Sequence, residues 1–258
     1  MKKPMDSRSL IEDLQATLQE QLRRAEQLEV LTTDRLERRP MPDAWSVLEI
    51  VEHLNILSGH YMRRLRKAYA GSGIFRKDPF LPGRWGEKLT TAMRPLPDGR
   101  IPGPMRTLWF FEPKAAHAKG RQSLQDFRAL LDEQAVLLDK ALARGIEGPR
   151  ITSTLGPILR FKIGDSFRFM IAHQQRHFLQ IDRALAAIAG NDALHQEGTR
   201  GQNPVPTASP LLKVAVTFPC VSPCSLAVIR SRSTTVTSAN LPTSKLPRNR
   251  GRAASWAS

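Results

Sequence analysis

Four stretches of the chain carry apolar residues at intervals of three and four positions, which is the spacing of one face of an α-helix. In the first stretch, residues 8–31, this face consists of Ile11, Leu14, Leu18, Leu22, Ala25 and Leu28. The same spacing predicts helices over 46–69 and 118–144, and a last helix that begins near 162–165 and ends at 190. No stretch before residue 200 alternates with a period of two over any length, so no β-sheet is predicted.

Local signals predict where these helices begin and end. Ser46 and Glu49 have the spacing of a capping box, in which each side chain bonds the backbone amide of the other residue. Ser123 is predicted to cap the third helix, and Gly71 and Gly190 are typical residues just beyond a helix end. The four helices are therefore expected to be separate elements.

The link between the second and third long helices is unusual in length. Residues 72–115 contain seven prolines together with Trp85 and Trp109, and leave room only for a short helix near 85–93. A connection of this length inside a domain is usually a cover over a site or a crossover. Four long amphipathic helices predict an all-α four-helix bundle, and a crossover between helices 2 and 3 would give it up-down-down-up order.

The charge distribution indicates a domain boundary. The chain has 258 residues with 39 Lys and Arg against 24 Asp and Glu, but the segment 200–258 contains eight basic residues and no acidic residue. We place the boundary near 192–200, with a helical domain over 1–195 and a basic, disordered tail over 196–258. Such a tail is compatible with a nucleic-acid-binding arm or with translation past a frameshift, and the complete lack of acidic residues after Glu197 favours the second explanation.

Cysteine usage and hydropathy exclude several classes of protein. Both cysteines, Cys220 and Cys224, lie in the tail, so the helical domain has no thiolate nucleophile and no cysteine-ligated zinc. The N-terminal residues show no apolar run after their charges, so we expect no signal peptide and a cytoplasmic protein. The most apolar window, 211–229, is interrupted by Lys213 and two prolines, which argues against a membrane span.

Three histidines lie on predicted inward faces. His173 and His177 are four residues apart, so their imidazoles share one face of the last helix, in line with its apolar residues. His53 lies on the inward stripe of the second helix. Three neutral imidazoles that leave a fourth position open are a typical catalytic metal site. Glu49 and Gln180, each about one turn from a histidine, are candidates for the groups that orient the rings.

Each of these residues also has a simpler explanation. An inward histidine is often a hydrogen-bonded core residue, and His60 is predicted to be structural because it lies about 10 Å along the helix from His53. Arg176 is a candidate for binding an anionic substrate, as is Arg168, although arginines on a helix more often lie on its solvated face. Spacing alone therefore leaves both metal binding and a metal-free core open.

Two runs of sequence resemble a known family. Residues 39–54, RPMPDAWSVLEIVEHL, are similar to the second-helix signature of the DinB-like superfamily, in which Trp-Ser is followed by His-Leu. Residues 173–180, HQQRHFLQ, are similar to the last helix of the same superfamily, with its His-x-x-x-His-x-x-Gln pattern. The resemblance covers about residues 8–190, and the two runs occur in the family's order.

This resemblance implies a four-helix bundle that binds one divalent metal ion through His53, His173 and His177. Zinc is the expected ion, with nickel or iron as alternatives. Known members include thiol S-transferases, so the implied function is a metal-dependent transferase that joins a low-molecular-weight thiol to an electrophile. The alternatives are a hydrolase that uses metal-bound hydroxide and a non-catalytic metal-binding stress-response module. A homodimer stays open, and nucleic-acid binding ranks last because the helical domain lacks a basic run with interleaved aromatics.

Overall fold

The computed structural model describes residues 3–101, 111–114 and 116–200, and of residues 117, 118, 157 and 193–200 it describes the backbone alone. These residues belong to one unit, Met1–Pro204, while a second unit, Val205–Ser258, lies outside the described residues, as does most of the predicted tail. In chain order the elements are α1 Ser7–Glu29, α2 Thr33–Glu37, α3 Val47–Ala70, α4 Arg84–Met93, α5 Ala116–Lys119, α6 Gln122–Arg144, β1 Ile151–Ser153, β2 Gly156–Phe161 and α7 Ile163–Arg200.

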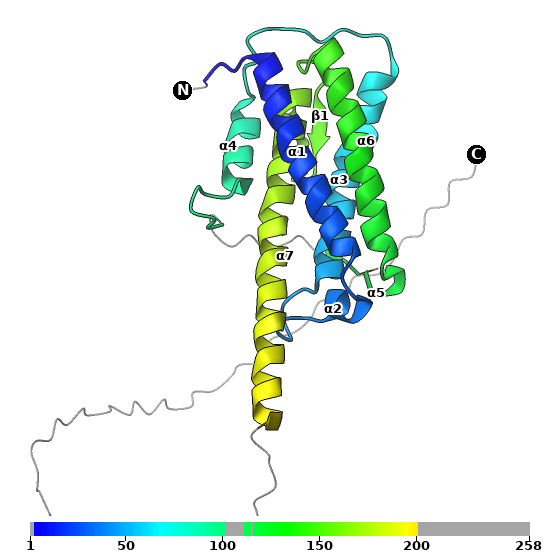
Figure 1. Ribbon diagram of the computed structural model, residues 1–258. Coiled ribbons are helices and arrows are strands. Elements are labelled where there is room, and N and C mark those ends of the chain that lie inside the picture. Colours follow the sequence, from blue (N-terminus) through cyan, green and yellow to red (C-terminus); the bar gives the residue numbers. More distant parts are fainter. Residues whose placement is uncertain (1–2, 102–110, 115, 201–258) are drawn as a thin grey trace, which may run out of the picture. The chain divides into compact units, whose positions relative to one another are not determined.

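Helices α3 and α6 lie side by side and run in the same direction. In the N-terminal half of α3 the Asn55 side-chain amide donates a hydrogen bond of 2.8 Å to the carbonyl oxygen of Ser123, in the first turn of α6. At their far ends the Arg144 guanidinium donates to the Tyr69 carbonyl oxygen, also at 2.8 Å. The long link between α3 and α6 therefore returns along the length of the helices, and α4 lies within it (Figure 1).

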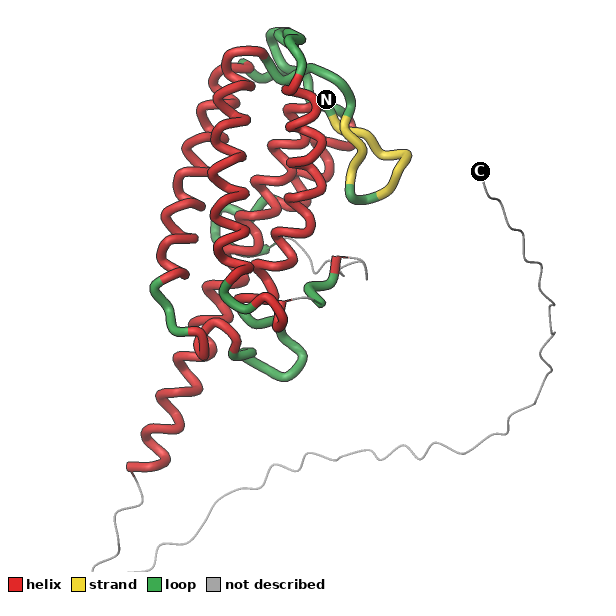
Figure 2. Tube along the Cα trace, turned by 90° about the vertical axis from the view of Figure 1, so that its right-hand side faces the viewer, coloured by secondary structure: helices red, strands yellow, loops and turns green. Residues whose placement is uncertain are grey.

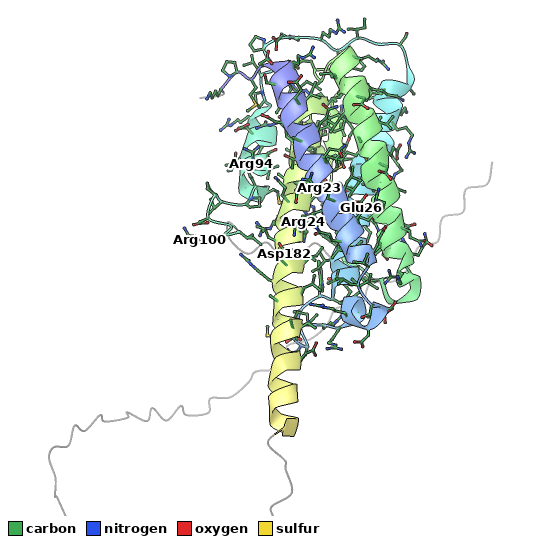
Figure 3. All side chains as sticks on the ribbon, in the orientation of Figure 1. Arg23, Arg24, Glu26, Arg94, Arg100 and Asp182 are labelled. Carbon is green, nitrogen blue, oxygen red and sulfur yellow. The ribbon has the colours of Figure 1, made fainter. Side chains whose placement is uncertain are left out.

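Helices α1 and α7 run together in the opposite direction. The Gln21 side chain donates to the Ile171 carbonyl oxygen at 3.1 Å, and further along both helices Arg24 pairs with Asp182. Figure 3 shows these two charged side chains where α1 and α7 lie against each other. Each of the four long helices packs against two of the others, and α7 continues beyond them at its C-terminal end (Figure 1).

The described structure is mostly helical, but it corrects the prediction that there is no sheet. Strands β1 and β2 form an antiparallel hairpin in which Ile151 pairs with Phe161 and Thr152 with Arg160, with a shift in register after Thr152. Figure 2 shows this hairpin at the side of the helices, before the chain enters α7. Its strands of three and six residues are too short to show a period of two in the sequence.

Three predicted helix ends can be compared with the structure. The capping box is confirmed, because the Ser46 hydroxyl accepts from the Glu49 amide and the Glu49 carboxylate accepts from the Ser46 amide. The prediction that Ser123 caps the third long helix was wrong. Helix α6 begins at Gln122, and the Ser123 hydroxyl donates a hydrogen bond to Glu52 of α3 instead. The stop at Gly190 was also wrong, because α7 continues to Arg200.

Helix α4 is held against α7 at one very close approach. The Gly83 amide donates to the buried Asp165 carboxylate at 2.7 Å. A Cβ atom at Gly86 would lie 2.2 Å from the Asp165 Cγ, so only glycine allows this contact. Arg168, one turn along α7, bonds both Asp165 and Glu87 of α4. These contacts fix the part of the long link that ends in Met93.

The inward stripes of the long helices form one apolar core. All six predicted stripe residues of α1 are buried, and so are most of those predicted for the other helices. Among the described residues, no helix is long and apolar enough to cross a membrane.

Candidate metal centre

Helices α3 and α7 place three imidazoles at one point between them. His53 lies in the second turn of α3, directly after the capping box, and His173 and His177 lie one turn apart on α7. All three residues are buried. The apolar residues around each histidine turn its helix face inward, and the antiparallel packing of α3 on α7 brings the faces together.

The three Nε2 atoms converge. The His173 Nε2 lies 3.3 Å from the Nε2 of His53 and 3.1 Å from the Nε2 of His177. One nitrogen from each ring lies within 4.8 Å of the other two. Among the described residues, these three histidines are the one group of at least three His, Cys, Asp or Glu side chains close enough together to hold a metal ion. Two nitrogens that each bind a tetrahedral zinc ion at about 2.0–2.1 Å are separated by about 3.3 Å. The observed spacing therefore fits a metal site.

Hydrogen bonds on the outer sides of two rings set their tautomers. The His53 Nδ1 donates to the Phe111 carbonyl oxygen at 2.8 Å, and the His177 Nδ1 donates to the Gln180 side-chain oxygen at 2.8 Å. Each ring then directs the unprotonated Nε2 toward the other two rings, as a metal ligand requires. Among the described residues, the buried His173 Nδ1 has no hydrogen-bond partner.

Burial keeps the rings uncharged. Desolvation lowers the pKa of His53 below the usual value, and it lowers the pKa of His173 far below that value. Burial is also the largest cause that lowers the pKa of His177, to about 3, and the nearby charge of Arg176 acts in the same direction. The neutral imidazoles present one ring nitrogen each to a common point, so their donor set suits a bound cation.

Of the two predicted orienting groups, Gln180 bonds a histidine and Glu49 does not occupy the predicted place. The Glu49 carboxylate accepts from Arg39 and from the Ser46 amide, at the start of α3. The His53 Nδ1 is bonded instead by the Phe111 carbonyl oxygen from the long link. Sequence reasoning missed this group because a backbone carbonyl has no residue type that marks it.

A cavity of about 320 Å³ opens beside the imidazoles. Its wall comes from the segment before α3, from α3 and α7, from the long link and from the hairpin turn. The lining residues are Asp43, Ala44, Trp45, His53, Leu57, Met93, Phe111, Thr154, Leu155, Phe169, His173, Arg176, His177 and Gln180. Half of these residues are apolar and half are polar or charged, and the size of the cavity suits a small organic molecule.

The hairpin reaches the cavity through a buried tyrosine. The Tyr61 hydroxyl of α3 lies 3.1 Å from the Ser153 hydroxyl and 3.2 Å from that of Thr154, and it accepts from the Thr154 amide. These bonds hold the turn between β1 and β2 against α3, so that Thr154 and Leu155 form one side of the cavity. The hairpin was not predicted, and the sequence therefore gave no indication of this wall.

The remaining histidines are not part of the cluster. The predicted structural role of His60 agrees with its position, because its Nε2 donates to the Thr152 carbonyl oxygen at 2.9 Å. The side chains of His117 and His195 lie outside the described residues. The sequence left open whether Arg176 lies on a solvated helix face or contacts a substrate. In the structure Arg176 is buried and lines the cavity.

Comparison with known proteins adds one finding. A family model described as the DinB superfamily matches residues 13–181, which include all three histidines of the cluster and the four long helices in large part. No curated protein and no solved structure matches the chain. The match covers well over half of the 258 residues, and it confirms the family indicated by the motifs around His53 and His173. The chain belongs to the DinB superfamily.

Proposed function

We propose that this protein is a four-helix bundle of up-down-down-up order that binds one divalent metal ion through His53, His173 and His177, and that it is a thiol-dependent S-transferase of the cytoplasm. The observation that carries the proposal is the convergence of three Nε2 atoms on the wall of a cavity. Those of His53 and His177 are unprotonated, because Nδ1 carries the proton in both rings. Zinc suits three imidazoles, and nickel and iron are the alternatives.

A bound metal ion would supply the group that activates a thiol. A divalent cation lowers the pKa of a bound thiol well below the value of about 8.5 for a free thiol, so that the reactive thiolate is present at neutral pH. The first 199 residues contain no cysteine. Among the described residues that line the cavity, Asp43 is the acidic one, and it is exposed. The site therefore suits a reaction that needs neither a protein thiol nor a buried protein base.

The residues around the imidazoles have separate tasks. The Phe111 carbonyl oxygen and Gln180 fix the orientation of two ligand rings. The apolar side chains of Trp45, Leu57 and Met93 limit water near a bound thiol and its electrophile. Exclusion of water favours attack by a thiolate over attack by hydroxide.

The test uses the zinc-loaded protein with monochlorobimane as electrophile and a panel of cellular thiols. We expect a metal-dependent conjugation rate with at least one thiol, lost in His53→Ala and kept in His60→Ala, because His60 lies outside the cluster. Elemental analysis of protein purified without added metal accompanies the assay.

The other outcomes are distinct. Metal-dependent hydrolysis of esters or amides without any thiol effect would replace this proposal by a hydrolase that uses metal-bound hydroxide. Bound metal without either activity would indicate a non-catalytic metal-binding stress-response module. Protein that neither retains nor takes up a divalent metal would contradict the proposal as a whole.

A further inference from the structure

A second cavity lies toward the C-terminal end of α3, away from the histidine cluster. Its volume is about 500 Å³, and it shares no lining residue with the cavity beside the imidazoles. Its wall comes from the last turns of α3, from the segment that follows this helix, and from β1 with the two residues before it. Among the described residues that line it, none is acidic and three are cationic, namely Arg64, Lys67 and Arg150. We call this the basic cavity.

Helix α3 places two of the three cations on one face. Arg64 and Lys67 are three residues apart, and Ala68, one turn after Arg64, lines the cavity on the same side. The Arg64 guanidinium donates to the His60 carbonyl oxygen at 2.9 Å, which holds this side chain along the helix. Arg150 comes from a segment far along the chain, so the fold brings separate positive charges together at one cavity.

The nearest acidic side chains in the sequence of these elements are engaged by other cations. Glu133 of α6 accepts from Arg66 of α3 at 2.6 and 2.7 Å, and Glu147 lies 2.8 Å from Lys162. In the part of the chain that the structure describes, none of the three cations of the basic cavity has an ion pair with a carboxylate. Their positive charge is therefore not neutralised by these protein groups.

Cations near a helix C-terminus often serve only to bond the last carbonyl groups of the helix. In α3 this place is taken by Arg144 of α6. Its guanidinium donates to the Tyr69 carbonyl oxygen at 2.8 Å and to the Gly73 carbonyl oxygen at 2.6 Å. Exposed Lys67, by contrast, makes no hydrogen bond within the described residues. Closing the end of α3 thus does not account for the cations of the basic cavity.

The remaining wall indicates what kind of anion the cavity suits. A phosphate group carries up to two charges and several acceptor oxygens, so it can pair with cations from separate segments at once. Ala68, Phe75 and Ile151 give the cavity an apolar side, which suits a carbon group attached to the phosphate. The volume of about 500 Å³ is typical of sites for small organic ligands.

We propose that the basic cavity binds a small organic phosphate, whose phosphate group pairs with Arg64, Lys67 and Arg150 while its apolar carbon group contacts Phe75. The inference is independent of the proposed function, because the two cavities have no lining residue in common. It gives the protein a second ligand site, at the junction of α3 with the hairpin.

The experiment is isothermal titration calorimetry of the full-length protein at an ionic strength of about 0.15 M, where charges more than about 8 Å apart are largely screened. The probes are phenyl phosphate, inorganic phosphate and phenol. We expect phenyl phosphate to bind about tenfold more tightly than either of the others. The double variant Arg64→Gln and Lys67→Gln should weaken the binding of phenyl phosphate at least about tenfold.

The matched control is the double variant Arg63→Gln and Arg66→Gln. It removes two charges from the same helix at positions that do not line the basic cavity, and its affinity for phenyl phosphate should change less than about twofold. An equal loss of affinity in both double variants would show attraction by the general charge of α3 and would overturn the inference.

Three other results would also overturn it. These are no measurable binding of phenyl phosphate, binding that survives in the Arg64 and Lys67 variant, and equal affinity for phenyl phosphate and inorganic phosphate. Circular dichroism checks the fold of each variant. If the Arg64 and Lys67 variant loses helical content, the exposed Lys67 and Arg150 are replaced singly by Gln, and unchanged affinity in both single variants would contradict the site.

Discussion

The interface between α3 and α7 has two ends of opposite character. At one end the ring of Tyr61 stacks on Phe161 and the ring of Tyr69 packs against Phe167. Both tyrosine hydroxyls are bonded, and that of Tyr69 donates to the Gly145 carbonyl oxygen at 2.8 Å. We call this the aromatic end. At the other, the histidine end, the buried nitrogens of His53, His173 and His177 face one another beside a cavity.

The difference shows where the protein gives up stability. The aromatic end buries large apolar side chains and satisfies the few polar atoms among them, which is how a core stabilises a fold. The histidine end buries three imidazoles whose Nε2 atoms face one another, and the buried His173 Nδ1 has no hydrogen-bond partner among the described residues, which costs free energy in the absence of a cation. Regions that break the rules of packing in this way are commonly binding sites.

The largest effect is expected at the histidine end, on metal binding. His173→Ala and His177→Ala each remove one of three ligands, so the affinity for zinc should fall by more than about a hundredfold. Metal content after purification without added metal should fall from about one ion per chain to nearly none. His60→Ala, on the same helix as His53 but bonded to Thr152, should retain the metal. Full occupancy in the His173/His177 double variant would contradict the model of the site.

A substitution at the aromatic end should have the reverse profile. Phe167 is fully buried, so Phe167→Ala should lower the free energy of unfolding by about 3–5 kcal/mol. Urea unfolding of the metal-free protein measures this change. The folded variant should still bind one metal ion per chain, because Phe167 does not line the cavity. Loss of metal together with stability would show that the two ends are coupled.

Apolar side chains in place of the three histidines should change the free energy of unfolding less than Phe167→Ala does, and in the opposite direction. The triple variant His53→Leu, His173→Leu and His177→Leu replaces all three mutually facing imidazoles, so no ring is left without its partner. In the metal-free state its free energy of unfolding should equal that of the wild type or exceed it by up to about 2 kcal/mol.

Added zinc should stabilise the wild type alone, by about 4 kcal/mol at a thousandfold excess over its dissociation constant. Strong destabilisation of the triple variant without metal would mean that the histidines contribute to the core rather than to a binding site.

The two ends were also unequally predictable from the sequence. The stripe on α7 predicted that His173 and His177 face inward, and the motifs around His53 and His173 predicted the family. The wall opposite them could not be predicted, because it depends on contacts between distant segments. The contact of the Phe111 carbonyl oxygen with His53 and the position of the Thr154 turn arise only when the long link and the hairpin fold onto the long helices.

The predictions of two helix ends were wrong for a related reason. Gly190 is a good stop signal, yet a Cβ at this position would meet nothing within 4 Å, so no packing forces the chain to turn there. A glycine inside a solvated helix costs about 1 kcal/mol, which the flanking residues of α7 can tolerate. Ser123 has the residue type of a cap, but its hydroxyl donates a hydrogen bond to the buried Glu52 carboxylate of α3. Tertiary partners decided both positions.

The smallest predicted effect concerns His60, which joins α3 to the hairpin without belonging to either end's central cluster. Burial lowers the pKa of His60 in the folded protein, while in the unfolded chain the pKa has its usual value near 6.5. As pH falls below about 6.5, the unfolded chain therefore takes up a proton before the folded protein does, and stability is lost. Above that pH both states are neutral at this residue and the contribution is complete.

His60→Gln keeps a donor near the Thr152 carbonyl oxygen but does not titrate. Metal-free wild type and variant are unfolded in urea at pH 7.5 and at pH 5.5, and the loss of stability between the two values is compared. We expect the wild type to lose more stability than the variant. The difference between the two losses should be smaller than the stability changes predicted for the variants at the aromatic end and the histidine end. The comparison between the two proteins cancels the contributions of the three clustered histidines, which titrate in both. An equal loss in the two proteins would show that His60 keeps its ordinary pKa, and that the hairpin is held to α3 by the Tyr61 hydroxyl rather than by a buried, neutral imidazole.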